Sequence, residues 1–343
     1  MIYNNFELYN IAELIPNEGG GFNMSRVPQH VREKMGKQGQ NMVICTGGAE
    51  IRFVLNSGKA KITLRLNRPG AATSALIYFG GVQSGWTTLR QNIYDHPTEI
   101  VLENPADQDK LKAISDASGY NYDTKVIRLL LESNEVVLCG CEGDVRPPRP
   151  EEVPSNRFMM YGSSITHGSL ACSQNLTFLS QISRRIGYDF YSYGFAGSCC
   201  LEREVADYIS EQGNEINPRS WDFAVLELGI NVLGMPSEEF SSRVDYLLDR
   251  MLEKNPGKKL FVIDIFYHIG DLFNDPKTNE FRAIVRNACA ARAQSHPQLR
   301  HIDGRTLLSS ARGLSADFVH PNVEGVREIA DKLGEILEVS INE

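Results

Sequence analysis

The feature that most constrains the fold of this chain is a change of hydrophobic periodicity across a proline-rich segment. The segment DVRPPRPEEVP, residues 144–154, carries prolines at 147, 148, 150 and 154. Proline at this density cannot continue a helix or a sheet and gives a stiff, extended connector. We therefore expect one domain over residues 1–146, a linker over 147–154 and a second domain over 155–343.

Before this segment, the chain consists of short runs that are typical of β-strands. The runs AEIRFVL, AKITLRL, SALIYFG, TEIVLE and KVIRLLL lie between residues 49 and 131, and several alternate apolar with polar side chains. Turn-rich pieces such as NSGK and NRPGAAT separate them. Many short strands with little helical pattern predict an antiparallel β-sandwich, which we expect to be jelly-roll-like.

After the proline-rich segment, strand-like runs alternate with helical stretches. The runs are RFMMYG, DFYSYG, DFAVLELG, KLFVIDIF and LRHID. They are apolar nearly throughout, as expected for a parallel sheet that is covered on both faces. From Pro321 onward, apolar residues recur at the three-and-four spacing of a helix with one buried face. The pattern predicts a doubly wound α/β domain, in which chemistry lies at the carboxyl ends of the strands.

Composition excludes several classes of partner. The net charge of −8 argues against nucleic acid and anionic membranes as partners. No run approaches the ~18 apolar residues of a membrane span. The N-terminal residues MIYNNFELYNIAEL lack the features of a secretory signal, and the scattered cysteines suit reduced thiols. We therefore expect a cytoplasmic protein without nucleic-acid or membrane partners.

Polar residues follow three of the predicted strands of the second domain. YGSSITHG places a serine at a strand-to-helix turn, where backbone N–H groups are free to bind an anion. YGFAGSCC places Gly197 in the next turn, and LELGIN places the amide of Asn231 just past the third strand. Near the C-terminus, ADFVHPNVEG puts Asp317 and His320 three residues apart, close enough for the carboxylate to orient the imidazole.

Together these residues form the inventory that acyl transfer through a serine requires. Serine is a poor nucleophile and needs a base within hydrogen-bond reach, and that base needs a carboxylate to fix its tautomer. The tetrahedral oxyanion needs preorganised donors. Hydroxyl, imidazole and amide groups suffice for this chemistry, so we expect no organic cofactor. The cysteine spacings match no zinc site, so we expect no metal.

The blocks GSSIT, GFAG, GIN and DFVHP resemble, in order and placement, the sequence blocks of the SGNH (GDSL-type) hydrolases. The resemblance implies that Ser164 is the nucleophile, with His320 as its base and Asp317 as the orienting carboxylate. It also implies an oxyanion hole made of the Ser164 N–H, the Gly197 N–H and the side-chain amide of Asn231.

The resemblance covers about residues 155–340 and includes one departure from the family pattern. The position before the nucleophile, usually Asp, is Ser163 here. This variant resembles members with an N-terminal β-sandwich, similar to carbohydrate esterase family two and related acyltransferases. Each site residue also has a structural alternative, since serine caps helices and glycine and asparagine occur in ordinary turns.

The resemblance predicts a serine esterase that hydrolyses short-chain acyl esters, acetyl esters first, of a carbohydrate or small alcohol. We expect Tyr267 and His268, which follow a predicted strand, to line the substrate pocket. Two alternatives are an acyltransferase with a non-water acceptor and a carbohydrate-binding protein without catalysis. The expected partner is a small-molecule or oligosaccharide ester, and a homo-oligomer is left open.

Overall fold

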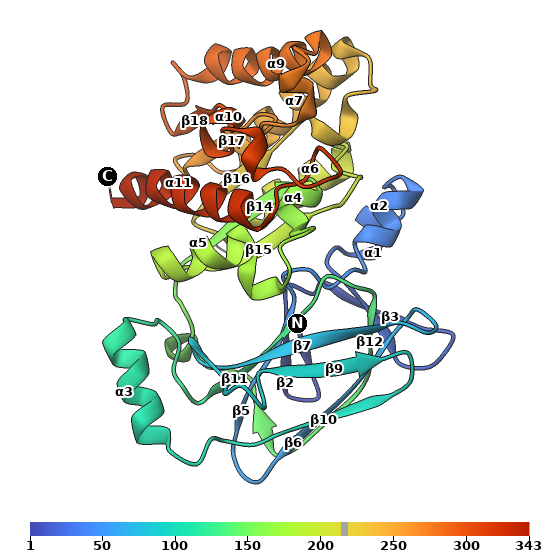
Figure 1. Ribbon diagram of the computed structural model, residues 1–343, viewed down its shortest axis with the longest axis vertical. Helices are drawn as coiled ribbons and strands as arrows, with labels where there is room; N and C mark the ends of the chain where they lie inside the picture. Colours follow the sequence, from blue (N-terminus) through green and yellow to red (C-terminus); the bar gives the residue numbers. More distant parts are fainter. Residues whose placement is uncertain (214–218, 343) are drawn as a thin grey trace. The chain divides into compact units, whose positions relative to one another are not determined.

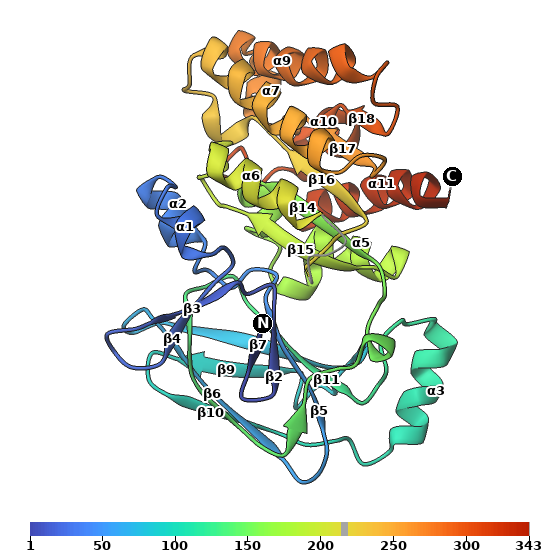
Figure 2. The same cartoon turned by 180° about the vertical axis from the view of Figure 1, so that it is seen from behind.

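The computed structural model of the chain describes residues 1–213 and 219–342 (Figures 1 and 2). Contacts within the chain define two compact units. The first unit contains Met1–Gln29, Val43–Ser155 and Gly187–Asp189, and the second contains His30–Met42, Asn156–Ile186 and Phe190–Glu343.

This division differs from the predicted boundaries at two segments. Residues 30–42 belong to the second unit although both their neighbours belong to the first, and residues 187–189 belong to the first unit. Residues 30–42 include most of α1 (Gln29–Arg32) and all of α2 (Lys37–Met42), which are short helices without a strong hydrophobic periodicity. Domains 1–146 and 155–343 with a linker at 147–154 stay a prediction.

The first unit is built from two sheets whose paired strands are antiparallel, as predicted for a sandwich. One sheet contains β1 (Ile2–Tyr3), β2 (Phe6–Tyr9), β5 (Glu50–Leu55), β11 (Val126–Leu131), β7 (Ala72–Phe79), β8 (Val82–Gln83), β9 (Arg90–Tyr94) and β13 (Val145–Arg146). The other has the order β10 (Thr98–Leu102), β6 (Ala60–Leu66), β12 (Val136–Glu142), β4 (Phe22–Ser25) and β3 (Glu13–Pro16).

The core of this unit follows from the alternation of side chains along its strands. Ile62 and Leu64 of β6 are fully buried, whereas Lys61 and Thr63, which alternate with them, are half-buried. Each buried side chain of this size stabilises the fold by about 1.5–3 kcal/mol. The helix α3 (Gln108–Ser118) was not expected from the sequence.

The proline-rich segment is less extended than predicted. It contains β13 and one turn of 3₁₀ helix, η1 (Pro150–Glu152). The Glu152 carboxylate accepts from the Arg146 guanidinium at 2.6 Å and from the Arg149 N–H at 2.7 Å. The second of these hydrogen bonds satisfies the Arg149 N–H, a backbone donor in a stretch where proline prevents regular ladder pairing.

A buried ion network crosses the first sheet of this unit. The Glu50 carboxylate accepts from the guanidinium groups of Arg52 and Arg128 at 2.6–2.8 Å, and Arg52 also donates to Asp189 at 2.6 Å. Burial acts to raise the pKa of Glu50, but the two guanidinium groups outweigh it and lower the pKa to about 2. Glu50 is therefore ionised, and each charge of the network has an opposite partner.

The second unit is organised around a five-stranded sheet. Its order is β15 (Asp189–Gly194), β14 (Arg157–Gly162), β16 (Phe223–Glu227), β17 (Leu260–Ile263) and β18 (Leu299–Ile302). The β14–β16, β16–β17 and β17–β18 pairs are parallel. The strand order reverses after β14, and in sheets of this kind ligands bind at such a reversal.

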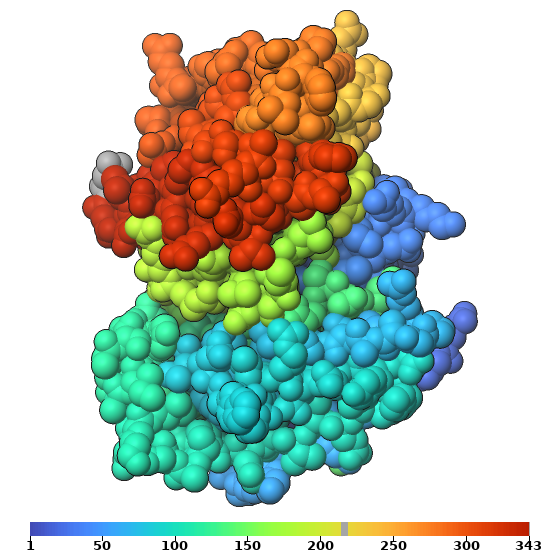
Figure 3. All heavy atoms as spheres, in the orientation of Figure 1, coloured from blue at the N-terminus to red at the C-terminus, as the bar shows by residue number. Residues whose placement is uncertain are grey.

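Helices cover both faces of this sheet, so the doubly wound prediction is confirmed. Helix α5 (Phe178–Ile186) packs on α11 (Val323–Asn342), whereas α7 (Ser237–Lys254) packs on both α6 (Arg203–Gln212) and α9 (Pro276–Arg292). Figure 3 shows α11 (red) on the face turned to the viewer, and Figure 2 shows α6 and α7 on the opposite face. Among the described residues, no helix combines the length and hydropathy that crossing a membrane requires.

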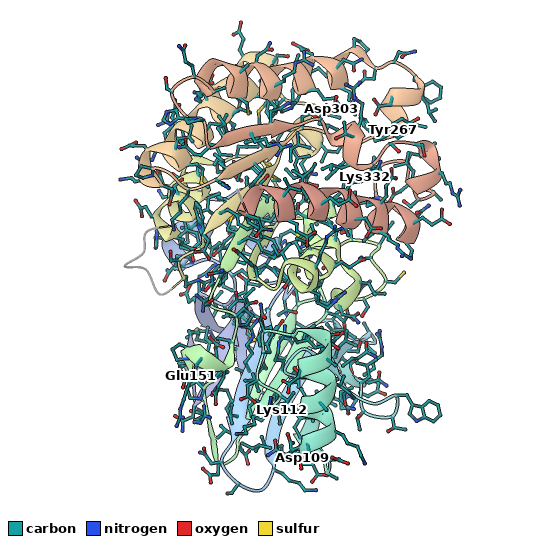
Figure 4. All side chains as sticks on the ribbon, turned by 90° about the vertical axis from the view of Figure 1, so that its left-hand side faces the viewer. Asp109, Lys112, Glu151, Tyr267, Asp303 and Lys332 are labelled. Carbon is teal, nitrogen blue, oxygen red and sulfur yellow. The ribbon has the colours of Figure 1, made fainter. Side chains whose placement is uncertain are left out.

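We expect Glu50→Gln to destabilise the protein by about 3 kcal/mol, because it leaves two buried guanidinium groups undercompensated. The matched control is Lys112→Ala on α3, which breaks an ion pair whose two side chains are 67% and 63% exposed (Figure 4). Surface pairs contribute little, so this variant should unfold with the wild type. The measurement is thermal unfolding of the full chain, and equal midpoints for both variants would contradict the prediction.

Candidate active site

Ser164 stands at the tightest turn of the second unit. It is the first residue of α4 (Ser164–His167), directly after β14, and Ser163 caps this helix by accepting the Ile165 N–H at 3.1 Å. A Cβ at Gly162 would lie 2.2 Å from Thr166 Oγ1, so only glycine fits there. The turn thus holds Ser164 at the carboxyl end of β14, where it is 7% exposed.

His320 and Asp317 meet Ser164 from the loop before α11. His320 Nε2 lies 2.6 Å from Ser164 Oγ, and His320 Nδ1 lies 2.7 Å from Asp317 Oδ2. Because a carboxylate can only accept, the Nδ1 proton points at Asp317 and leaves Nε2 to accept from the serine hydroxyl. The three predicted residues therefore form one continuous chain of hydrogen bonds.

Asp317 is held in its ionised state. Partial burial acts to raise its pKa, but hydrogen bonds from the His320 N–H, the Ser315 hydroxyl and the Val319 N–H keep the pKa well below the usual range. The carboxylate is therefore ionised at neutral pH and can stabilise a positive imidazole.

The three predicted oxyanion donors lie beside this chain and line the same cavity. Gly197 has a φ of +65°, and Asn231 lies in η3 (Ile230–Val232). Asn231 Oδ1 accepts the Cys199 N–H at 3.1 Å. The NH₂ group of Asn231 therefore points away from Cys199 and remains available as a donor. In the described part of the chain, no acceptor binds the N–H of Ser164, the N–H of Gly197 or this NH₂ group. Donors without acceptors are what a developing oxyanion requires.

The cavity has a volume of about 590 Å³, within the range of small-ligand sites. Apolar side chains and the predicted catalytic groups line it together. The lining residues are Gln38, Met42, Ser164, Ser169, Ala196, Gly197, Ile230, Asn231, Leu233, His268, Asp317, Val319 and His320.

Of the two predicted pocket residues, His268 lines the cavity and Tyr267 (Figure 4) does not. His268 Nδ1 accepts from the Gly270 N–H at 3.3 Å, and Nε2 lies 3.1 Å from Thr278 Oγ1. Burial lowers the pKa of His268, so its ring is neutral and offers the cavity an apolar surface. Residues 1–213 and 219–342 contain no grouping of His, Cys, Asp or Glu that could hold a metal ion.

The sequence reasoning missed three residues of this region. Gln38 and Met42 line the cavity from α2, and Gln38 Nε2 donates to the Ala196 carbonyl at 3.3 Å. Their segment KQGQNM is polar and short, so it carried no signal. Glu227 ends β16 directly below the serine turn and is 1% exposed. An acidic residue inside the apolar run DFAVLELG was a visible signal.

Unlike the buried Glu50 and Asp189, Glu227 has no Lys or Arg partner among the described residues. Burial raises its pKa to about 7, and hydrogen bonds from Ser163 and Thr166 offset only part of this shift. The folded protein therefore keeps the Glu227 proton between about pH 4.5 and 7, whereas the unfolded chain releases it. Over this interval the wild type loses stability as the pH rises, by about 3 kcal/mol in total.

Glu227→Gln removes this titration, because an amide does not ionise. The free energy of unfolding of the variant, minus that of the wild type, should rise by about 3 kcal/mol between pH 4 and pH 8. Urea unfolding of both proteins at several pH values measures it, and all other titrating groups cancel in the difference. A difference that does not change with pH would contradict the raised pKa.

Comparisons with solved structures find proteins of similar fold. The structure of salicylyl-acyltransferase SsfX3 from a tetracycline biosynthetic pathway matches with a TM-score of 0.74 and 16% identity, covering 98% of this chain and 95% of that one. A putative GDSL-like lipase from Bacteroides ovatus matches with a TM-score of 0.65 and 17% identity, covering 98% of both chains. An acetyl xylan esterase from Butyrivibrio proteoclasticus matches with a TM-score of 0.58 and 11% identity, covering 99% and 96%.

At these identities the structural matches show the fold alone, and no curated protein sequence matches the chain. The family assignment comes from the sequence. Residues 155–338, more than half of the chain, match the model of the GDSL-like Lipase/Acylhydrolase family. The matched range contains the serine turn, the Asn231 loop and the Asp317–His320 loop. This chain therefore belongs to the GDSL-like lipase/acylhydrolase family of serine ester hydrolases.

Proposed function

We propose that this chain removes short acyl groups, acetyl first, from a carbohydrate or other small alcohol through an acyl-enzyme. One observation carries the proposal: Ser164, His320 and Asp317 are joined by hydrogen bonds of 2.6 and 2.7 Å at the wall of a cavity. The similarity in fold to an acetyl xylan esterase supports the acetyl group and the sugar alcohol.

In the first half of the reaction, Ser164 Oγ attacks the carbonyl carbon of the ester while its proton passes to His320 Nε2. Asp317 stabilises the imidazolium through the Nδ1–H bond. The negative oxygen of the tetrahedral intermediate accepts from the N–H groups of Ser164 and Gly197 and from the amide of Asn231. Each such donor lowers the barrier by roughly 3 kcal/mol.

Collapse of this intermediate breaks the bond to the alcohol oxygen, which takes the proton from His320 Nε2 and leaves. In the second half, His320 removes a proton from water as the water attacks the acyl-enzyme, and the same donors bind the second oxyanion. Release of the carboxylic acid returns the proton to Ser164 Oγ.

Hydrolysis of p-nitrophenyl esters from acetyl to octanoyl tests this proposal. We expect activity to fall with chain length in the wild type and to be abolished in Ser164→Ala. Ser163→Ala is the matched control, because it removes a neighbouring hydroxyl but keeps the nucleophile and should retain hydrolysis. Activity that rises with chain length would move the substrate to lipids, and acyl groups delivered mainly to an added alcohol would indicate a transferase.

We expect Asp317→Asn to lower kcat roughly ten-thousandfold, because its amide donates to Nδ1 and turns the Nε2 proton toward Ser164. KM should change little, since this residue orients the base. The matched control is Asp303→Asn (Figure 4), which alters a carboxylate that caps the short helix α10 (Gly304–Leu307). A kcat equal to that of the wild type would remove Asp317 from the mechanism.

A further inference from the structure

Glu227 is a buried carboxyl group that the proposed mechanism does not use, although it touches the turn that carries the nucleophile. Its Oε2 accepts the Ser163 N–H at 2.6 Å and the Thr166 hydroxyl at 3.0 Å. These two donors stand on either side of Ser164 in the chain. One oxygen atom therefore binds the residues on both sides of Ser164.

The turn is shaped around this oxygen. A Cβ added at Gly162 would lie 2.6 Å from Glu227 Oε2, inside contact distance. The Ser163 N–H has no acceptor other than Glu227 among the described residues. The neighbouring hydrogen bonds, from the His167 N–H to the Ser163 carbonyl and from the Phe195 N–H to the Gly162 carbonyl, hold other parts of the turn.

The second oxygen of the Glu227 carboxyl group differs from the first in its hydrogen bonding. Glu227 Oε1 is buried and has no hydrogen-bond partner within the described part of the chain. Within residues 1–213 and 219–342, no Lys or Arg pairs with Glu227, unlike the buried Glu50. A half-satisfied acid in a dry environment costs stability and would be replaced at little loss by an apolar side chain if it served packing alone.

We propose that Glu227 is a positioning residue for the nucleophile. Its Oε2 fixes the backbone on both sides of Ser164, so that Ser164 Oγ stays within 2.6 Å of His320 Nε2 and the Ser164 N–H faces the cavity. Glu227 touches neither substrate nor reacting atoms. The inference rests on the proposed function of Ser164 as nucleophile.

The test compares Glu227→Ala, which loses the acceptor, with Glu227→Gln, whose amide oxygen keeps it. Misplacing a reacting group by about 1 Å costs roughly a hundredfold in rate, so we expect that fall in kcat for Glu227→Ala, with KM little changed. Glu227→Gln should restore most of the lost rate. A second readout is the rate at which a fluorophosphonate labels Ser164, which should fall and recover in parallel.

Asp264 offers a matched control for the loss of a buried carboxylate. It follows β17 as Glu227 ends β16, and its Oδ1 accepts the Gly304 N–H at 2.8 Å, at a turn outside the cavity. Asp264→Ala should lose stability while its folded fraction keeps the wild-type kcat. If Glu227→Ala does not fold, a comparison of Thr166→Val with Thr166→Ser replaces it. We expect kcat to fall roughly fivefold in the valine variant alone.

Three results would overturn the inference: a wild-type kcat in folded Glu227→Ala, a Gln variant as slow as the Ala variant, or an equal fall in kcat in Asp264→Ala. Hydrolysis and labelling assays of the wild type distinguish these results from a failure of the proposed function. If the wild type neither hydrolyses an ester nor is labelled at Ser164, the proposed function fails and the inference fails with it.

Discussion

The site depends on one constraint, the parallel pairing of β14 with β16. Tyr161 stands opposite Leu226 in this register, so both strands end at the same edge of the sheet. The serine turn follows β14 and the Asn231 loop follows β16. No long connection is therefore needed to bring the two segments together. Because the strand order reverses at β14, the helices leave on opposite faces and open the space between the two turns.

The protein uses buried carboxyl groups in two different ways. Glu50 lies between two guanidinium groups, and its pKa is lowered to about 2. Glu227 receives only neutral donors, and burial raises its pKa to about 7. The first arrangement is charge-balanced and belongs to the framework of a sheet. The second leaves Glu227 Oε1 without a hydrogen-bond partner among the described residues, next to the turn that carries Ser164.

Much of the fold could be predicted because burial imposes periodicity on strands and long helices. The run AKITLRL is β6 to the residue, and the apolar face from Val326 to Leu337 is the buried face of α11. The Ser164 turn was predictable because its block follows a strand end, and Asp317 and His320 because they lie three residues apart directly before a helix. Short polar helices such as α2 lack such periodicity. Tyr267 and His268 are adjacent, and only the local backbone decides which of the two faces the cavity.

Residues 30–42 belong to the second unit, yet they are synthesised before most of the first. During translation, β4 can pair with β3 and β5 with β2 while the packing partners of residues 30–42 have not yet been made. Gln38 must wait for Ala196, whose carbonyl it binds, to emerge. This part of the cavity wall is therefore synthesised early, but it can pack into place only after the residues that it contacts have been synthesised. Vectorial synthesis therefore delays completion of the cavity until the C-terminal sheet has formed.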